Sequence, residues 1–353
     1  MTQPKDVFNT LAIDIGGANL KACFVDKAGC CLGFSEPFTI CQQVHVLVDA
    51  LEHLLNQCPQ IPQRLLLTMT AELCDCFADR SQGVRRILDA VNKVVGDRPV
   101  YIWTTHGCFV DRQQAMGHPL SVASANWHAL ATWVGMQHPD QNALLLDTGS
   151  TTTDIIPVLQ GQVAADGSTD ASRLEHGELI YLGASVTPLM VLQDPDERFA
   201  ICSEWFANMH DVGLVLNYIS PQADVLSTPD GQPRTVKAAG RRLLRMVGRD
   251  WQSGQPEQDI QNIARQFLTR MTSRLHQAIK RKLDEYTCVE MLIISGSGRW
   301  LLDQTLKRFD LQTRVIYLEE SWGNDQSISA CATALIKLYT SGKLNNKTNL
   351  PYT

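Results

Sequence analysis

The chain has 353 residues, a mass of 39.2 kDa and a formal net charge of −6, with 44% hydrophobic and 19% charged residues. This length predicts about two domains, and the composition excludes collagen, coiled coils and disordered chains. The slightly acidic balance argues against nucleic acid as a partner, because binding to a phosphate backbone needs a basic surface. A local basic pocket remains compatible with it.

The first residues and the cysteines indicate a cytoplasmic protein without a membrane anchor. Asp6 and Asp14 interrupt the N-terminal segment, so the basic and apolar regions of a secretory signal are missing. No apolar run approaches the roughly 18 residues of a membrane span. Eleven cysteines form no regular framework, which favours reduced thiols. Cys74 and Cys76 lie close together without a second pair, so we interpret them as small buried side chains rather than a zinc site.

The first predicted element is a buried strand over residues 10–17, which ends in Asp14 and a glycine pair. A second strand is expected over residues 21–26. Asn19 and Lys21 are placed at the turn and at its exit. The segment therefore predicts a hairpin around Gly16 and Gly17.

The same pattern returns at residues 143–158. A strand ends in Asp147, a turn rich in glycine, serine and threonine follows, and a second strand is expected over residues 155–158. Two copies of strand, aspartate, glycine turn and strand predict a duplicated architecture.

The C-terminal half predicts a long helix, a third glycine turn and a helix of small residues. Apolar residues recur every three or four positions over residues 257–283, as in an amphipathic helix. The strand over 289–295 leads into Gly296 and Gly298, and a helical pattern follows. Residues 329–334 predict a helix that packs closely where two lobes meet. We expect lobes at 1–140 and 141–340, a frayed tail at 341–353, and loops at 219–234 and 251–256.

Each of the two turns, with its aspartate and its glycine, carries the groups that bind phosphate. A turn that follows a strand can aim backbone N–H groups at phosphate oxygens, and a carboxylate at the strand end can hold Mg²⁺. One such turn would be weak evidence, because strand ends often use glycine for conformational reasons alone. Two copies facing each other across a cleft predict a phosphate or pyrophosphate site.

The three turns, at positions 14–21, 147–154 and 295–298, resemble in order the two phosphate loops and the adenosine turn of the actin, sugar kinase and Hsp70 superfamily. This resemblance implies an α/β, two-lobed, actin-like fold, built from a duplicated ribonuclease H-like unit with a cleft between the lobes. The segment that begins at Asp147, DTGSTTTDI, resembles the hydantoinase and oxoprolinase branch.

Four further segments narrow the resemblance. Residues 68–73 (TMTAEL), 124–127 (SANW), 176–181 (HGELIY) and the pair Thr187-Pro188 are similar to the tetrahydromethanopterin-linked C1 transfer pathway family, which is related to archaeal synthases of methanofuran biosynthesis. The resemblance covers about residues 10–340.

That family implies a transferase that moves an alkyl or aryl group other than methyl. A phenol oxygen, from γ-glutamyltyramine or a tyrosine analogue, attacks a furanylmethyl diphosphate (5-aminomethyl-3-furanmethanol diphosphate), which forms an aryl ether and releases pyrophosphate. The furan ring can carry positive charge from the reacting carbon, so the enzyme mainly stabilises the leaving diphosphate and orients the phenol. Mg²⁺ is the expected cofactor, and ATP is compatible with the site but not required.

The residue roles follow from this resemblance and from the chemistry of the turns. Asp14 and Asp147 are expected near Mg²⁺, Lys21 is expected to contact the anion, and Asp154 and Glu72 are candidates for the base. Glu72 could equally cap a helix, and Asn126 either orients substrate or forms a local turn. The expected diphosphate cradle and third turn comprise Gly16, Gly17, Asn19, Gly149, Ser150, Thr151, Thr152, Gly296 and Gly298.

A basic segment and one histidine remain open. Lys237, Arg241, Arg245 and Arg249 recur every four residues and would share one helical face. That face is either solvated, or Arg241 or Arg245 reaches the diphosphate or the γ-glutamyl carboxylate. His176, beside Gly177 and Glu178, is either structural or part of the site.

Two other classes of function stay open at this point. An ATP-dependent small-molecule kinase or ATPase would use the same loops, and so would a non-catalytic nucleotide sensor. The intact carboxylates at 14, 147 and 154 argue against a silent site. The expected partners are small diphosphate and phenolic molecules, with neither nucleic acid nor membrane, and a homodimer is left open.

Overall fold

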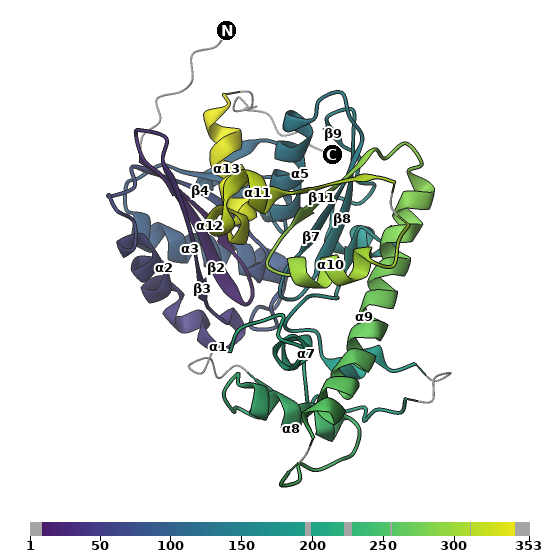
Figure 1. The fold of residues 1–353 in the computed structure, drawn as a ribbon. Coiled ribbons are helices and arrows are strands. Elements are labelled where there is room, and N and C mark those ends of the chain that lie inside the picture. Colours follow the sequence, from purple (N-terminus) through teal and green to yellow (C-terminus); the bar gives the residue numbers. More distant parts are fainter. Residues whose placement is uncertain (1–8, 195–198, 222–227, 255, 311, 343–353) are drawn as a thin grey trace.

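The computed structural model describes residues 9–194, 199–221, 228–254, 256–310 and 312–342. Figure 1 shows two sheets side by side. The first has the order β3-β2-β1-β4-β5-β6. Its strands are β1 (Thr10–Ile15), β2 (Asn19–Val25), β3 (Cys31–Pro37), β4 (Arg64–Met69), β5 (Val100–Trp103) and β6 (Phe109–Asp111).

The second sheet repeats the arrangement of the first. Its order is β10-β8-β7-β11-β12, with β9 paired to β8. In each sheet a hairpin, β1 with β2 or β7 with β8, is followed by a strand that lies parallel to the first hairpin strand. The repeat confirms the predicted duplicated α/β architecture. The strands are β7 (Ala143–Thr148), β8 (Thr153–Leu159), β9 (Gln162–Val163), β10 (Leu179–Ile180), β11 (Met291–Ser295) and β12 (Arg314–Tyr317).

Both hairpins are tighter than the sequence pattern predicts. The N–H of Gly16 donates to the carbonyl of Asn19 at 3.0 Å, so the turn is complete by that residue. The strand predicted from residue 21 therefore starts at Asn19, and Lys21 lies inside β2, paired with Asp14. In the second hairpin β8 starts at Thr153 rather than at residue 155, because its ladder continues to Thr148.

Helices cover the sheets and connect the strands. The α-helices are α1 (Ile40–Gln43), α2 (Leu47–Asn56), α3 (Arg80–Val95), α4 (Arg112–Gly117), α5 (Asn126–Gln137), α6 (Asp170–Glu175), α7 (Met209–Val215), α8 (Val236–Met246), α9 (Glu257–Glu285), α10 (Arg299–Leu306), α11 (Leu318–Trp322), α12 (Asn324–Ile328) and α13 (Ala330–Thr340). Short 3₁₀ helices are η1 (Val44–Val46), η2 (Ala71–Leu73), η3 (Pro119–Ser121) and η4 (Leu189–Leu192).

Two helices, α5 and α13, pack against each other between the sheets (Figure 1). The helix predicted from the small residues 329–334 is α13, and it buries Leu335 and Ile336 against Ala12 and Leu66 of the first sheet. In α5, Leu130 packs with the second sheet. The C-terminal helix therefore covers the N-terminal sheet, and the helix before residue 140 covers the C-terminal one.

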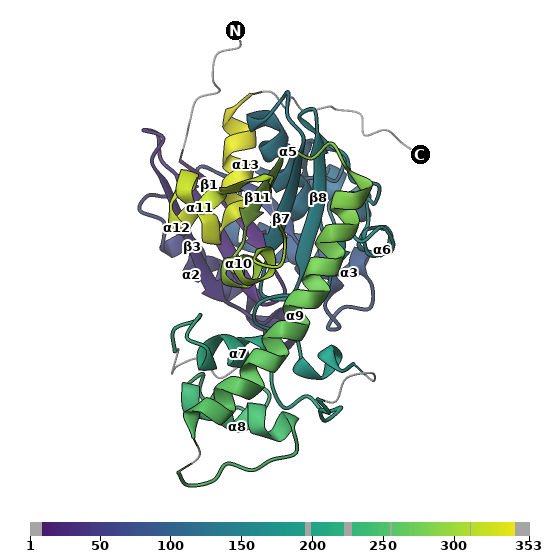
Figure 2. The ribbon, with the colours of Figure 1, turned by 45° about the vertical axis from the view of Figure 1, so that its right-hand side comes forward.

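A smaller helical unit lies below the sheets in Figures 1 and 2. Leu214 of α7, Leu243 of α8 and Phe267 of α9 share its core. The long helix predicted over 257–283 is α9, which runs from this unit up along the second sheet (Figure 2). The described parts of the predicted loop 219–234 contain no helix or strand. Residues 222–227 of this loop and residues 343–353 of the predicted tail lie outside the described residues.

Within the described ranges, no helix combines the length and the apolar character that crossing a bilayer requires.

Candidate active site

The two hairpin turns present partly exposed backbone N–H groups. In each turn one glycine N–H closes the loop: Gly16 donates to Asn19 at 3.0 Å, and Gly149 donates to Thr152 at 2.9 Å. Within the described ranges, the N–H groups of Gly17, Ser150 and Thr151 donate to no protein acceptor. Such groups can bind the oxygens of an anion.

The structure brings the predicted aspartates of both hairpins together around Lys21. Asp147 pairs with Asp154 across β7 and β8, and Asp14 pairs with Lys21 across β1 and β2. Burial raises the pKa of Asp14 to about 6, while Lys21 and a hydrogen bond from Asn126 oppose this rise. Burial likewise raises the pKa of Asp147 to about 6, and the charge of Asp154 adds to it. Lys21 thus acts on all three carboxylates, and Asp154 has a second cation in Arg173.

This carboxylate group fits Mg²⁺ bound together with a substrate. The Oδ1 atom of Asp14 is buried and has no hydrogen-bond partner in the described part of the chain. The raised pKa values of Asp14 and Asp147 show that their negative charge is incompletely compensated. No group of three or more His, Cys, Asp or Glu among the described residues is arranged to hold a metal ion. Mg²⁺ does not need one, because it commonly uses one or two carboxylates, water and substrate phosphates.

The third glycine turn packs directly on the end of β7. Gly296 has a φ of +92°, and a Cβ atom there would lie 2.5 Å from the Oδ1 of Asp147. The N–H of Gly298 donates to the carbonyl of Thr148 at 2.8 Å. Only glycine at 296 allows this approach, since other residues rarely adopt that φ. The predicted third turn therefore lies beside Asp147.

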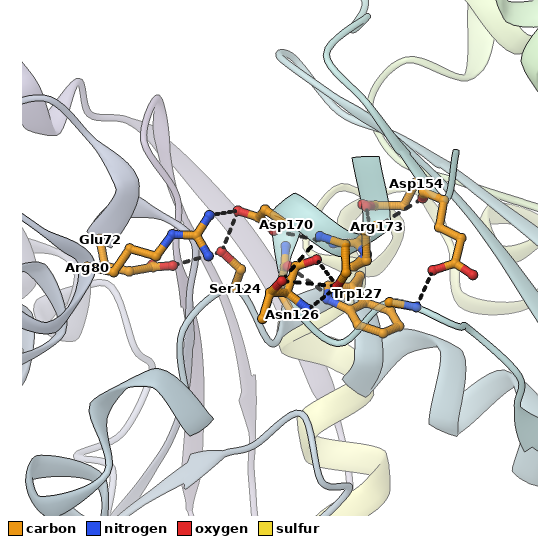
Figure 3. A network of polar contacts seen from close by, with 12 residues as sticks. Glu72, Arg80, Ser124, Asn126, Trp127, Asp154, Asp170 and Arg173 are labelled. Atoms are coloured by element: carbon orange, nitrogen blue, oxygen red, sulfur yellow. Dashed lines mark hydrogen bonds and ion pairs between the residues drawn. The ribbon is translucent and has the colours of Figure 1, made fainter. Parts of the chain in front are cut away.

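A polar network that sequence analysis did not predict joins the two lobes (Figure 3). Ser124, just before α5, donates its hydroxyl to Glu72 Oε1 at 2.8 Å and also lies 3.0 Å from Asp170 Oδ2. Asp170 forms ion pairs with Arg80 at 2.9 Å and with Arg173 at 3.6 Å. Ser124 has a φ of +47°, which is unusual for a residue with a side chain.

Arg173 connects this network to the aspartates. Its guanidinium pairs with Asp154 and lies 4.2 Å from the ring centre of Trp127. Its side chain is 2% exposed, so the charge is compensated inside the protein. The spacing of Asp170 and Arg173 on one helix was a local signal for a paired arginine. Arg80 and Asp154 are far away in the chain, and no local pattern links them to it.

Arg241 and Arg245, the two candidates for an arginine clamp, lie in the helical unit. Arg241 lies over the ring of Trp251 at 5.8 Å, and Arg245 is half-exposed and 3.6 Å from Asp230. Both are on α8, at the end of the molecule away from the sheets (Figures 1 and 2). The buried arginine of this helix is Arg242, which pairs with Asp211 at 2.6 Å.

Glu72, Asn126 and His176 each make local contacts that bear on their alternative roles. Glu72 does not cap α3, because the Asp79 side chain accepts from the N–H of Gln82 at 2.7 Å. Asn126 accepts from the N–H of Trp127 at 2.8 Å and hydrogen-bonds to Asp14. His176 is exposed and binds the Ser172 carbonyl at 2.7 Å, which ends α6.

Cys74 and Cys76 follow η2, beside the first glycine turn. A Cβ atom on Gly17 would lie 3.1 Å from the Cys74 sulfur. Burial raises the pKa of both thiols, and hydrogen bonds with Cys41 add to the rise. These cysteines are therefore neutral thiols at neutral pH.

The hydantoinase/oxoprolinase family model matches residues 66–339. The chain belongs to this family. A (4-{4-[2-(gamma-L-glutamylamino)ethyl]phenoxymethyl}furan-2-yl)methanamine synthase of Methanocaldococcus jannaschii is 30% identical over 342 residues, which cover 93% of this chain and 96% of the relative. A synthase of the same name from Methanococcus vannielii is 31% identical over 219 residues, or 60% of this chain and 97% of the relative.

This chain is thus related over nearly its whole length to a biosynthetic enzyme. Among solved structures, nucleotide-free acetone carboxylase superposes with a TM-score of 0.55 at 10% identity, over 93% of this chain and 70% of that one. This likeness concerns the fold alone. Together with the repeated sheet order it confirms the predicted two-lobed, actin-like α/β fold.

Proposed function

We propose that the protein is a transferase that joins a phenol oxygen to the methylene carbon of a furanylmethyl diphosphate. The observation that carries the proposal is the 30% identity over 93% of the chain to a synthase whose named product contains a phenoxymethylfuran. The phenol donor would be γ-glutamyltyramine or a tyrosine analogue. The new bond is an aryl ether, and pyrophosphate leaves.

The two hairpin turns would bind the diphosphate. Backbone N–H groups of Gly17, Ser150 and Thr151 supply donors, and Lys21 supplies a positive charge near the carboxylates. Asp14 and Asp147 would hold Mg²⁺, which when bound neutralises charge on the leaving diphosphate. The third turn, at Gly296 and Gly298, fixes the end of β7 and thereby the position of Asp147.

The chemistry needs stabilisation of a leaving anion more than a strong nucleophile. As the carbon–oxygen bond to the diphosphate breaks, the furan ring spreads the positive charge of the methylene carbon. The phenol oxygen then forms the new bond and loses its proton to a base. Holding both reactants in line supplies a large part of the rate.

All eleven cysteines are free, which supports a reaction in the reducing cytoplasm.

The test follows ether product by mass spectrometry and pyrophosphate release, with Mg²⁺ and with or without ATP. The substrates are the furanylmethyl diphosphate and γ-glutamyltyramine. We expect product that requires the phenol and Mg²⁺ but not ATP. Asp147→Asn should lose most of the activity, and the exposed neighbour Asp140→Asn should retain it.

Three outcomes would contradict the proposal in whole or in part. Phosphate release from ATP without ether would assign the protein to the kinase or ATPase class. Nucleotide binding without turnover would assign it to the sensors. A wild-type enzyme that needs ATP to make the ether would contradict the diphosphate chemistry, although not the ether product.

A further inference from the structure

Glu72 has one carboxylate oxygen in a hydrogen bond, and the other is buried without a partner among the described residues. The residue lies in η2, directly after β4, and is 1% exposed. Its Oε1 accepts the Ser124 hydroxyl at 2.8 Å. Its Oε2 is buried and has no hydrogen-bond partner in the described part of the chain. A buried carboxylate oxygen without a donor is a place where a proton is favoured.

The Ser124 hydroxyl has a single proton for two acceptors. It lies 2.8 Å from Glu72 and 3.0 Å from Asp170, and it can donate to only one of them at a time. Asp170 has other partners, because it pairs with Arg80 and Arg173. Glu72 has no ion pair of this kind among the described residues. When a proton arrives between the two acids, Glu72 is therefore the one that takes it.

The electrostatics of Glu72 agree with this geometry. Burial raises its pKa to about 7, the Asp170 charge adds to the rise, and Ser124 and Arg80 oppose it. The groups that face it are Asp170 of α6, Arg80 of α3, Ser124 before α5, Cys74 after η2 and Tyr181 after β10. A base works best when its pKa lies near the working pH.

Asp154, the other candidate base, is committed to Arg173. That arginine is 2% exposed, and its guanidinium pairs with Asp154. A proton on Asp154 would leave the buried arginine charge with Asp170 alone, at 3.6 Å, which is costly. The structure therefore favours Asp154 as a fixed partner of Arg173 and leaves Glu72 available for proton transfer.

A phenol ring of the protein already lies beside the network. Tyr181 is 46% exposed, and the charges of Asp170, Arg80, Glu72 and Asp154 all act on its hydroxyl. The phenol donor of the proposed reaction carries the same hydroxyphenyl group.

We propose that Glu72 is the general base of the ether-forming step, with Ser124 and Asp170 as positioning residues. This inference rests on the proposed function. The phenol O–H bond breaks and its proton moves to Glu72 Oε2, while the phenol oxygen bonds to the furan methylene carbon. The bond from that carbon to the diphosphate breaks, and pyrophosphate leaves with the electron pair. Glu72 afterwards returns its proton to water.

The experiment measures kcat/KM for ether formation between pH 5 and 9. In the wild type, kcat/KM should rise up to about pH 7 and then level off. Glu72→Gln should lower it by about 10²- to 10⁴-fold and leave only the rise near pH 6 that comes from ionisation of Asp14 and Asp147. A tyramine substrate fluorinated on the ring is a stronger acid, so it should recover part of the loss in this variant only.

Two further variants separate catalysis from folding. Ser124→Ala removes the donor that favours the ionised carboxylate, so the rise should move to higher pH. This result tests the role of Glu72 as base even if circular dichroism shows that the Glu72→Gln variant does not fold. Glu175→Gln changes an exposed acid on the helix of Asp170 and should match the wild type.

The outcomes distinguish the two proposals. Ether formation by Glu72→Gln with an unchanged pH profile, or a Ser124→Ala profile that does not move, would overturn the assignment of the base and leave the transferase intact. A wild-type protein that makes no ether would overturn both.

Discussion

At the scale of single residues, burial in the folded protein disfavours the ionised form of the acids in the site. Asp14 is 4% exposed, and burial raises its pKa from 3.8 to about 6. Since one pKa unit corresponds to about 1.4 kcal/mol, the ionised form costs the fold roughly 3 kcal/mol. A site prepared for a cation carries this charge in the absence of its ligand.

The stability of Asp14→Asn tests this cost. The folded pKa lies above the unfolded one, so the folded state binds more protons between about pH 4 and 6, and stability falls as pH rises through that window. Asparagine has no charge to bury. We expect the variant to be more stable than the wild type by about 1–3 kcal/mol at pH 7.5, with no difference near pH 4, in urea denaturation. Asp140→Asn should change neither value, and a variant less stable at pH 7.5 would contradict the account.

Binding of a metal ion should compensate the same buried negative charge and thereby stabilise the fold. Mg²⁺ with pyrophosphate should raise the melting temperature of the wild type, because a ligand of the native state stabilises it. The carboxylates must be ionised to bind, so the rise should be larger at pH 8 than at pH 5. In Asp14→Asn and Asp147→Asn the rise should be small at both pH values. An equal rise in all three proteins would place the ligand elsewhere.

At the scale of elements, α3 holds the base in position through one glycine. A Cβ atom on Gly83 would lie 2.5 Å from the backbone oxygen of Glu72 and 2.7 Å from its Cα. The helix can therefore approach η2 only with glycine at this point. The contact fixes where the Glu72 side chain starts.

Gly83→Ala should push η2 away from α3. We expect a loss of stability of about 1–3 kcal/mol, because the added methyl group overpacks a buried contact. Ether formation should fall as well, since Glu72 moves. Gly117→Ala, in α4, is the matched control, because a Cβ atom there meets open space. Equal thermal melts and equal activities for the two variants would show that η2 adapts without loss.

The hairpins were readable from sequence, whereas the network around Glu72 was not. Asp14, Asp147 and the glycines after them follow short apolar strands, so their type and place were local information. Asp170 and Arg80 are 90 positions apart, and only the fold brings them together. The same holds for the helical unit of α7, α8 and α9, whose core combines residues such as Leu214 and Phe267 from separate helices. The spacing of the basic residues around Arg242 likewise did not indicate that this side chain is buried and paired with Asp211.

At the scale of the whole molecule, the two lobes exchange helices. The first sheet is covered by α13, from the end of the chain, through Leu335, Ile336 and Leu338. Each of these side chains contributes roughly 1.5–3 kcal/mol by burial. The first lobe therefore depends on residues from the C-terminal end of the chain.

A fragment of residues 1–140 should accordingly fail to unfold cooperatively. The same fragment joined through a glycine and serine linker to residues 324–353 should recover a cooperative transition, because α13 again covers the sheet. Thermal melts followed by circular dichroism compare the two. Cooperative melting of the shorter fragment would show that the first sheet needs no cover from α13.

The backbone of Ser124 has a consequence for engineering. Its φ of +47° costs a residue with a side chain about 1 kcal/mol or more, and glycine would adopt it freely. Glycine would also remove the hydroxyl that lies between Glu72 and Asp170. A selection for thermal tolerance alone should favour Ser124→Gly, and a selection for turnover should reject it. At this position thermal stability favours glycine, whereas catalysis favours serine.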